Sequence, residues 1–117
     1  MRRVVHTYKA LSDPNRLRIL MMLKEKSLCV CEMVDVLALA NSTVSKHLSL
    51  LRNADLIMDE KEGRWVNYRL ATAEESDDVV SVMDQLEKQL GKDDQILQDR
   101  KQLGVRNRYD ICGSSPP

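Results

Sequence analysis

No phenylalanine occurs among the 117 residues of the chain, and aromatic residues make up only 3% of it. The core must therefore be built from leucine, valine, isoleucine and methionine. Charged residues, mostly of types that favour helices, make up 31%. A chain of this length forms one domain with a modest core. We therefore expect a helical protein whose apolar stripes meet in that core or across a dimer interface.

Long apolar segments are also missing from the sequence. No run approaches the roughly 20 apolar residues that a membrane-spanning helix needs. The first ten residues contain two arginines but lack the apolar segment of a signal peptide. We therefore expect a cytoplasmic protein that has no membrane partner.

Net charge is absent, because 18 basic and 18 acidic side chains cancel. The charges are nevertheless unevenly distributed along the chain. Residues 1–73 carry 12 Lys and Arg against 8 Asp and Glu, whereas residues 74–117 carry 6 against 10. A basic N-terminal part is compatible with a polyanionic partner such as nucleic acid.

Cysteine is scarce, and the number of cysteines is odd: Cys29, Cys31 and Cys112. An odd number in a cytosolic chain argues against a disulfide framework. We therefore expect reduced thiols that serve packing, metal binding or sensing.

The spacing of apolar residues predicts two helices at the N-terminus. The first spans residues 2–11. The second starts at Ser12-Asp13-Pro14, where a capping side chain precedes a proline in the first helical position. This second helix is expected to end near Lys24.

Two shorter helices are predicted over residues 29–39 and 42–53, joined by a tight connection. Asn41 or Ser42 is expected to cap the second of them. The residues of this helix that face the core are Val44, Leu48 and Leu51. Its remaining surface carries hydroxyl groups and a lysine, which suit a groove of DNA. These residues are Ser42, Thr43, Ser45, Lys46 and Ser49.

Beyond residue 55 the apolar spacing changes from that of a helix to that of strands. A strand-like run starts at Leu56, and apolar residues alternate between Trp65 and Leu70, with a charged turn between the two. Residues 74–103 return to helical spacing, with an apolar stripe that can continue past Gly91. We predict a domain over residues 1–103 and a mobile tail over residues 104–117.

Two helices joined by a tight turn and followed by a hairpin are the element order of a winged helix-turn-helix. We therefore predict a mainly α fold with a β-hairpin wing, of the α+β class. Residues 42–53 would be the recognition helix in the major groove. The wing would span residues 59–65, where Lys61 and Arg64 would reach phosphates or the minor groove. His47 is expected to be a partly buried packing residue.

Four segments resemble the ArsR/SmtB family of metal-responsive repressors, and they occur in the family's order. Residues 10–20 are similar to its opening motif, and residues 28–33 to the metal box in its third helix. Residues 42–51 resemble its recognition helix, and residues 63–70 its wing. The resemblance covers residues 8–71. It implies a homodimer whose first and last helices form the dimer interface, and operator DNA as the partner.

The segment Leu-Cys-Val-Cys-Glu around Cys29 and Cys31 is, within this resemblance, typical of sensors of trivalent arsenic or antimony. Thiolates are soft ligands that favour such thiophilic ions. The family's zinc-type site uses Asp and His on the last helix, but the only histidines here are His6 and His47. Relatives that sense cadmium or lead add a cysteine near the N-terminus, which is not found in this chain.

The third ligand of such a site departs from the family pattern. Arsenic sensors often carry a cysteine three residues after the second one, where this chain has Val34. Cys112 could take its place if the tail folds back, from its own or from the partner subunit. A small cellular thiol is the alternative.

Helix geometry predicts how such a site would act on DNA. Residues two positions apart on an ideal helix point about 200° away from each other. Cys29 and Cys31 both belong to the predicted helix, so they cannot both bind one ion while that turn stays helical. We therefore expect binding to unwind or bend the start of the helix and to tilt the recognition helix away from DNA.

The leading hypothesis is therefore a repressor that arsenite or antimonite releases from its operator. A cadmium- or lead-responsive repressor, or a cysteine-based redox switch on the same fold, is the alternative. A helical adaptor that does not bind DNA is a further one. No phosphate-binding glycine loop, Ser-His-Asp triad or carboxylate pair can be identified, so we expect no enzymatic activity.

Overall fold

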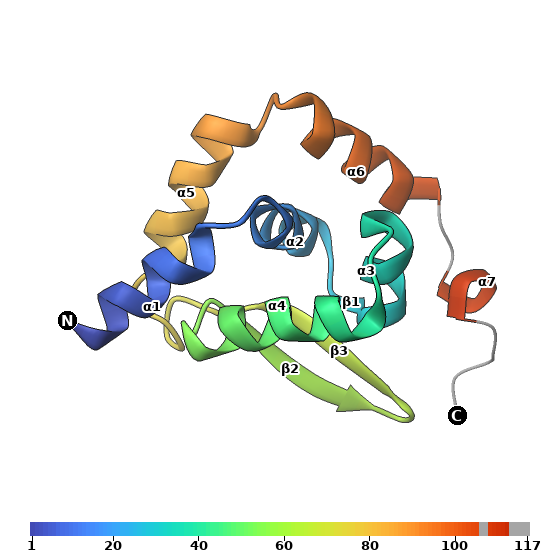
Figure 1. Ribbon diagram of the computed structural model, residues 1–117, viewed down its shortest axis with the longest axis horizontal. Helices are drawn as coiled ribbons and strands as arrows, with labels where there is room; N and C mark the ends of the chain where they lie inside the picture. The colour runs from blue at the N-terminus through green and yellow to red at the C-terminus, as the bar shows by residue number, and fades with distance from the viewer. Residues whose placement is uncertain (106–107, 113–117) are drawn as a thin grey trace.

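The computed structural model describes residues 1–105 and 108–112 and shows mainly helices, with a small sheet at one side of the molecule (Figure 1). In chain order the elements are α1 (Arg2–Leu11), α2 (Pro14–Glu25), β1 (Leu28–Cys29), α3 (Val30–Leu37), α4 (Asn41–Asn53), β2 (Ile57–Glu62), β3 (Trp65–Leu70), α5 (Val79–Leu90), α6 (Asp94–Val105) and α7 (Arg108–Cys112). The pair α3–α4 and the hairpin β2–β3 are those of a winged helix-turn-helix, as predicted.

Helix α2 lies at the centre of the molecule. It contacts α1, α4, α5, α6 and β3. In Figure 1, α5 and α6 form an arch over α2, while α4 and the hairpin lie on its other side. Residues 19–23 are consequently all buried, with exposed fractions of 5% or less. No helix in the described part of the chain has both the length and the apolar character that crossing a membrane requires.

The start of α2 follows the predicted capping pattern. The side chain of Asp13 accepts hydrogen bonds from the backbone N–H groups of Asn15 at 2.8 Å and Arg16 at 3.4 Å. Pro14 is the first helical residue, where a backbone N–H is not needed. The boundary between α1 and α2 is therefore fixed by local chemistry that the sequence displays.

The predicted cap of α4 is wrong. The helix begins at Asn41, and Ala40 takes the capping position without a side-chain hydrogen bond. The turn before it depends on Ala38, which adopts a left-handed conformation with φ 57° and ends α3. The three residues predicted to face the core are buried, as expected: Val44, Leu48 and Leu51.

The sheet has a strand that sequence spacing did not predict. The hairpin pairs β2 with β3 in antiparallel register from Ile57 opposite Leu70 to Glu62 opposite Trp65. Gly63 in the turn has φ 63°, a conformation that favours glycine. The two-residue strand β1 pairs with β3 on its other side, giving the order β1-β3-β2. A strand of two residues is too short to show the alternation of apolar and polar side chains by which strands are predicted.

The predicted helix over residues 74–103 is divided in two. α5 starts only at Val79, and the chain turns after Leu90. The side chain of Asp93 then accepts hydrogen bonds from the backbone N–H groups of the second and third residues that follow it, which starts α6. The apolar stripe therefore does not continue in one helix past Gly91.

The end of the chain also differs from the prediction. α6 extends to Val105, two residues into the predicted tail, and α7 forms a further helix that contacts α3. Residues 106–107 and 113–117, which belong to the same predicted tail, lie outside the described residues. The mobility of the tail stays a prediction, but part of it has regular structure.

Candidate thiol site and nucleic-acid interface

Cys29 lies just outside helix α3. It is the last residue of β1, where it pairs with Asn67 of β3, and its backbone is extended, with φ −90° and ψ 167°. The helical rotation of 100° per residue therefore starts only after Cys29. Its Sγ atom lies 3.1 Å from that of Cys31, although α3 is intact. The prediction that both cysteines belong to the helix, and cannot face one ion without unwinding it, is wrong.

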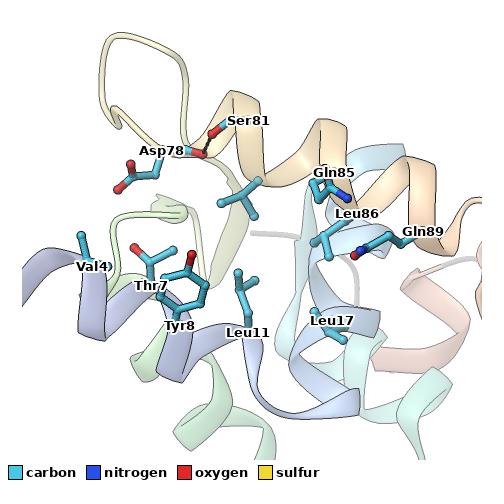
Figure 2. A pocket seen from close by; sticks show the side chains of 11 residues that line it. Val4, Thr7, Tyr8, Leu11, Leu17, Asp78, Ser81, Gln85, Leu86 and Gln89 are labelled. Carbon is cyan, nitrogen blue, oxygen red and sulfur yellow. Dashed lines mark hydrogen bonds between the residues drawn. The ribbon is translucent and has the colours of Figure 1, made fainter.

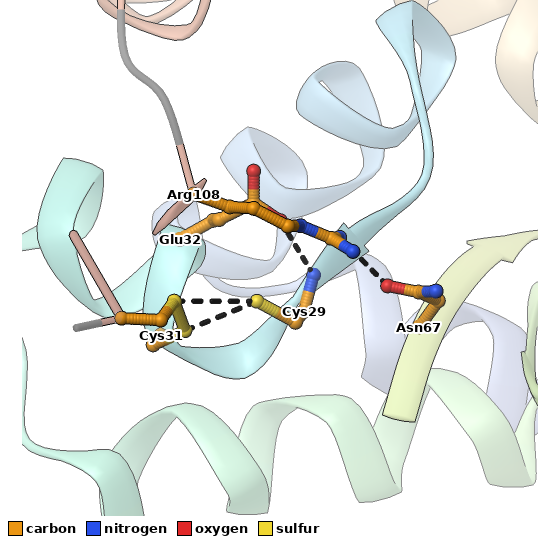
Figure 3. Close-up of a disulfide and its surroundings, with 6 residues drawn as sticks. Cys29, Cys31, Glu32, Asn67 and Arg108 are labelled. Carbon is orange, nitrogen blue, oxygen red and sulfur yellow. Dashed lines mark hydrogen bonds and ion pairs between the residues drawn. A yellow bond between two sulfur atoms is a disulfide. The ribbon is translucent and has the colours of Figure 1, made fainter. Parts of the chain in front are cut away.

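Helix α7 brings the third cysteine to the disulfide that lies beside Cys29 in Figure 3. The Sγ atom of Cys112 lies 3.7 Å from that of Cys29, and Cys112 forms a disulfide with Cys31 across 81 residues of sequence. All three sulfurs lie within 4.8 Å of one another. The expectation that every thiol is reduced is therefore not met in this structure. That expectation was based on cysteine number and compartment, which say nothing about which sulfurs meet in space.

The spacing of the sulfurs fits one soft ion. Sulfurs that each lie roughly 2.3 Å from a common ion can be no more than roughly 4.6 Å apart. The distances from Cys29 to the other two sulfurs satisfy this limit. The disulfide must first be reduced, since only free thiols or thiolates can act as ligands. Within the described residues, the cysteines are the only cluster of potential metal ligands of this kind.

Burial controls the charge of the Cys29 thiol. The residue is 4% exposed, and this burial raises the pKa of its thiol, although a hydrogen bond from the backbone N–H of Glu32 opposes the shift. Burial therefore disfavours the thiolate form of Cys29.

Glu32 organises the start of α3 beside the sulfurs. Its Oε1 atom accepts the backbone N–H of Cys29 at 3.0 Å, which satisfies a donor at the helix start. The carboxylate is 6% exposed and forms an ion pair with Arg108 of α7. A buried carboxylate needs such a partner, and Arg108 of α7 supplies it.

Arg108 has the widest set of contacts in this region. Its Nε and Nη2 atoms donate to Oε1 of Glu32 at 3.1 and 2.7 Å, and Nη2 also donates to Oδ1 of Asn67 at 2.7 Å. Its Cζ atom lies 4.5 Å from the centre of the Trp65 ring. Arg108 therefore joins α7, α3 and the wing strand β3. Sequence spacing could not find it, because a lone arginine in a segment without periodicity carries no signal.

The predicted DNA-facing side chains of α4 lie on its exposed surface. The exposed residues are Ser42, Thr43, Ser45, Lys46 and Ser49. Lys61 and Arg64 are likewise exposed near the tip of the hairpin. A helix and a hairpin that present hydroxyl and basic groups have the shape and chemistry for a DNA groove and its phosphates.

His47 is partly buried, as predicted. Its Nδ1 atom lies 3.0 Å from Nη1 of Arg16, a buried arginine of α2. Arg16 also donates to the carbonyl groups of Ala10 at 2.9 Å and Lys9 at 3.1 Å. These contacts join the end of α1 to α2 and α4. Arg16 thus fixes the position of α4, a role that spacing alone did not predict.

A groove of about 530 Å³ lies between α1 and α5 (Figure 2). Its apolar lining consists of Val4, Tyr8, Leu11, Leu17, Val82 and Leu86. Tyr8 is 70% exposed and Val4 is 49% exposed. Large apolar side chains that line an open groove on two helices are typical of a surface that another protein surface covers.

Comparison with known proteins identifies the family. The description "Bacterial regulatory protein, arsR family" matches residues 13–59. The arsenical resistance operon repressor of Escherichia coli (strain K12) is 41% identical over 68 residues, which cover 57% of this chain and 58% of that protein. The chain thus spans little more than half the length of the curated arsenic regulators that it matches.

Solved structures extend the similarity beyond the matched segment. HlyU from Vibrio cholerae N16961 superimposes with a TM-score of 0.66 at 32% identity, covering 78% of this chain and 95% of that one. The homodimeric winged helix-turn-helix domain of Mb0332 from Mycobacterium bovis has a TM-score of 0.63 at 25% identity, with coverage of 76% and 82%. The Escherichia coli relative is named as a repressor and Mb0332 is described as a possible ArsR-family transcriptional regulator, which agrees with the expectation of no enzymatic activity. The chain matches the arsR-family description and is 32% identical to HlyU, of which it covers 95%, so it belongs to the arsR family of bacterial regulatory proteins.

Proposed function

We propose that this chain is a dimeric repressor that binds operator DNA and leaves it when trivalent arsenic or antimony joins its three sulfurs. The observation that carries this proposal is the convergence of Cys29, Cys31 and Cys112 within 4.8 Å. Two of these residues flank the start of the helix-turn-helix, so the ligand would bind next to the DNA-reading unit.

The number of sulfurs favours a trivalent metalloid over zinc or cadmium. A trivalent metalloid forms three bonds and keeps a lone pair, whereas zinc sites are almost always four-coordinate. The cluster in the described residues offers three cysteine sulfurs and no fourth ligand. His47 is already engaged with Arg16. The name of the Escherichia coli relative, an arsenical resistance operon repressor, supports the same choice.

DNA binding is assigned to α4 and the wing. In a helix-turn-helix the second helix enters the major groove, and its flanking elements contact phosphates. Ser42, Thr43, Ser45, Lys46 and Ser49 would face the groove, and Lys61 and Arg64 would extend the contact from the wing. The helical adaptor without DNA binding is disfavoured, because the relatives are regulators.

Dimerisation is assigned to the groove between α1 and α5. A second copy that covers this groove would bury Val4 and Tyr8. Mb0332, which shares the fold, is described as homodimeric. A two-fold dimer presents two recognition helices to successive half-sites of an operator. The dimer therefore binds the operator more tightly than a single recognition helix would.

A redox-responsive repressor is the second candidate function, and the disulfide between Cys31 and Cys112 favours it. Its formation removes two protons and two electrons, which a cellular oxidant such as a peroxide would accept. The metalloid and the disulfide would compete, since both use the same sulfurs. The raised pKa of Cys29 makes that thiol a poor initiator of oxidation.

The test is an electrophoretic mobility shift assay with the full chain and its own promoter fragment. We expect arsenite to release the reduced wild-type protein, and the Cys29→Ser, Cys31→Ser double variant to stay bound. Peroxide without metalloid serves as the parallel arm, and release by peroxide alone would favour the redox function. Release of the double variant by arsenite would remove the site assignment.

A further inference from the structure

We propose that Arg108 is a positioning residue that transmits the state of the three sulfurs to the wing. This inference rests on the proposed function and adds the route by which ligand binding reaches the DNA-binding surface. The route is needed because the sulfurs meet with α3 intact, so binding does not require the unwinding that we expected from the sequence.

The first step is the link between the sulfurs and α7. Arg108 and Cys112 are the first and last residues of α7. At this spacing of four residues, side chains lie on one face of a helix. A helix of five residues does not persist alone in water. Its position therefore depends on the bond at Cys112 and on the contacts of Arg108.

The second step is the link between α7 and the wing. Arg108 donates to Asn67 and lies over the ring of Trp65, and both residues belong to β3. Trp65 follows Arg64 directly in the turn, and Asn67 pairs with Glu60 of β2. A guanidinium that leaves these two side chains therefore releases the Trp65 and Asn67 side chains next to the basic tip, while β3 stays paired with β1 and β2.

The third step is the energetic difference between α7 docked through Arg108 and α7 released. Arg108 is 19% exposed and Glu32 is 6% exposed in their ion pair. When Arg108 departs, the buried carboxylate loses its ion-pair partner, which is unfavourable even though the N–H of Cys29 still donates to it. Bridging of Cys112 to the other sulfurs holds Arg108 in place, whereas free thiols allow α7 to leave. The sulfurs thus bias a two-state element, as a switch requires.

The chain offers a direct probe, because Trp65 is its only tryptophan. The experiment titrates the reduced full chain with sodium arsenite and follows two signals. Ultraviolet absorption of the arsenic–thiolate bonds reports binding, and Trp65 fluorescence reports the approach of Arg108. We expect both signals to change together in the wild type.

The variants separate positioning from binding. Arg108→Gln is expected to bind arsenite with the wild-type stoichiometry. The change in its Trp65 fluorescence on binding is expected to be about fivefold smaller than in wild type, and so is its loss of operator affinity with arsenite. Arg108→Lys retains the charge and is expected to recover part of the Trp65 fluorescence change and part of the loss of operator affinity. Lys101→Gln, which removes an exposed positive charge from α6, is the matched control and should behave as wild type. A wild-type Trp65 response in Arg108→Gln would overturn the inference.

A second arm distinguishes this inference from the proposed function. In a Cys29→Ser background, diamide oxidises Cys31 and Cys112 to their disulfide and accepts the two protons and two electrons. The difference in Trp65 emission between this form and the reduced form should again require Arg108. If arsenite fails to bind but this difference persists, the metalloid function fails and the Arg108 link stands. If neither bound arsenite nor the disulfide alters Trp65 emission in the presence of Arg108, the proposed link from the sulfurs to the wing through Arg108 is wrong.

Discussion

The Sγ atom of Cys29 lies 3.1 Å from the Sγ atom of Cys31 because a strand ends and a helix begins between the two residues. Cys29 takes its direction from the sheet, and Cys31 takes its direction from α3. The two sulfurs therefore converge without any distortion of the helix-turn-helix. A site that is formed before binding pays no local unfolding cost, and the response must travel by another path than helix unwinding.

DNA binding can be tested through its dependence on salt. Lys46→Gln in α4 and Arg64→Gln in the wing are each expected to lower the slope of log affinity against log salt by about 1, because each removes one phosphate contact. Gel-shift or anisotropy titrations at several salt concentrations measure this slope. Lys101→Gln, on α6, is the control. Equal slopes in all four proteins would argue against these contacts.

Dimerisation can be tested at the groove between α1 and α5. Tyr8→Asp places a charge on the apolar surface, and we expect the dimer dissociation constant to rise by about tenfold or more. Sedimentation equilibrium measures this constant. Val105→Asp changes a side chain on α6 that is even more exposed, 79% against 70%, and should leave the dimer unchanged. The assignment fails if Val105→Asp weakens the dimer and Tyr8→Asp does not.

The stability of the C-terminal part depends on the ion pair between Arg18 of α2 and Asp99 of α6. Two hydrogen bonds of 2.8 Å join their side chains, and Asp99 is only 2% exposed. Asp99→Ala leaves the arginine without its partner and is expected to lower the free energy of unfolding by about 3–5 kcal/mol. Urea unfolding followed by circular dichroism measures it.

A second variant checks the cause of that loss. In the double variant Arg18→Met, Asp99→Leu both charges are replaced by apolar groups, so we expect most of the lost stability to return. A double variant as unstable as Asp99→Ala would show that packing, rather than the unpaired charge, sets the cost.

Acid stability should depend on the contact between the wing and the segment that follows it. Arg69 of β3 holds Glu75 with bonds of 2.7 and 3.0 Å. This hydrogen bond lowers the pKa of Glu75 from 4.5 to about 2. The contribution is therefore complete above pH 4.5 and is lost as the pH falls towards 2. We expect the stability difference between wild type and Glu75→Gln to shrink over this range in thermal unfolding. A constant difference would contradict the assignment.

Local signals predicted much of the fold. The Asp13-Pro14 start of α2, the buried stripe of α4 and the hairpin around Gly63 each follow from residues close in sequence. The apolar face of α4 was found because three residues repeat at helical spacing. These elements were sufficient to predict the winged helix-turn-helix.

Features that depend on distant contacts were not predictable in the same way. Strand β1 exists because β3 offers it a partner, and that pairing moves Cys29 out of the helix. The position of Cys112 depends on the turn after Leu90 and on the docking of α7. The partners that the described residues offer Arg108 lie in α3 and β3, far from it in sequence. The cysteines themselves were named from the sequence, but their geometry was predicted wrongly because the start of α3 was placed one residue early.

The most direct test of the central claim is an arsenite titration of the reduced full chain, followed by the ultraviolet absorption of arsenic–thiolate bonds. We expect one metalloid per chain in the wild type, no comparable band in Cys29→Ser or Cys31→Ser, and weaker binding in Cys112→Ser. An unchanged titration in Cys112→Ser would exclude the tail cysteine as a ligand. An unchanged titration in the Cys29→Ser, Cys31→Ser double variant would contradict the three-sulfur site altogether.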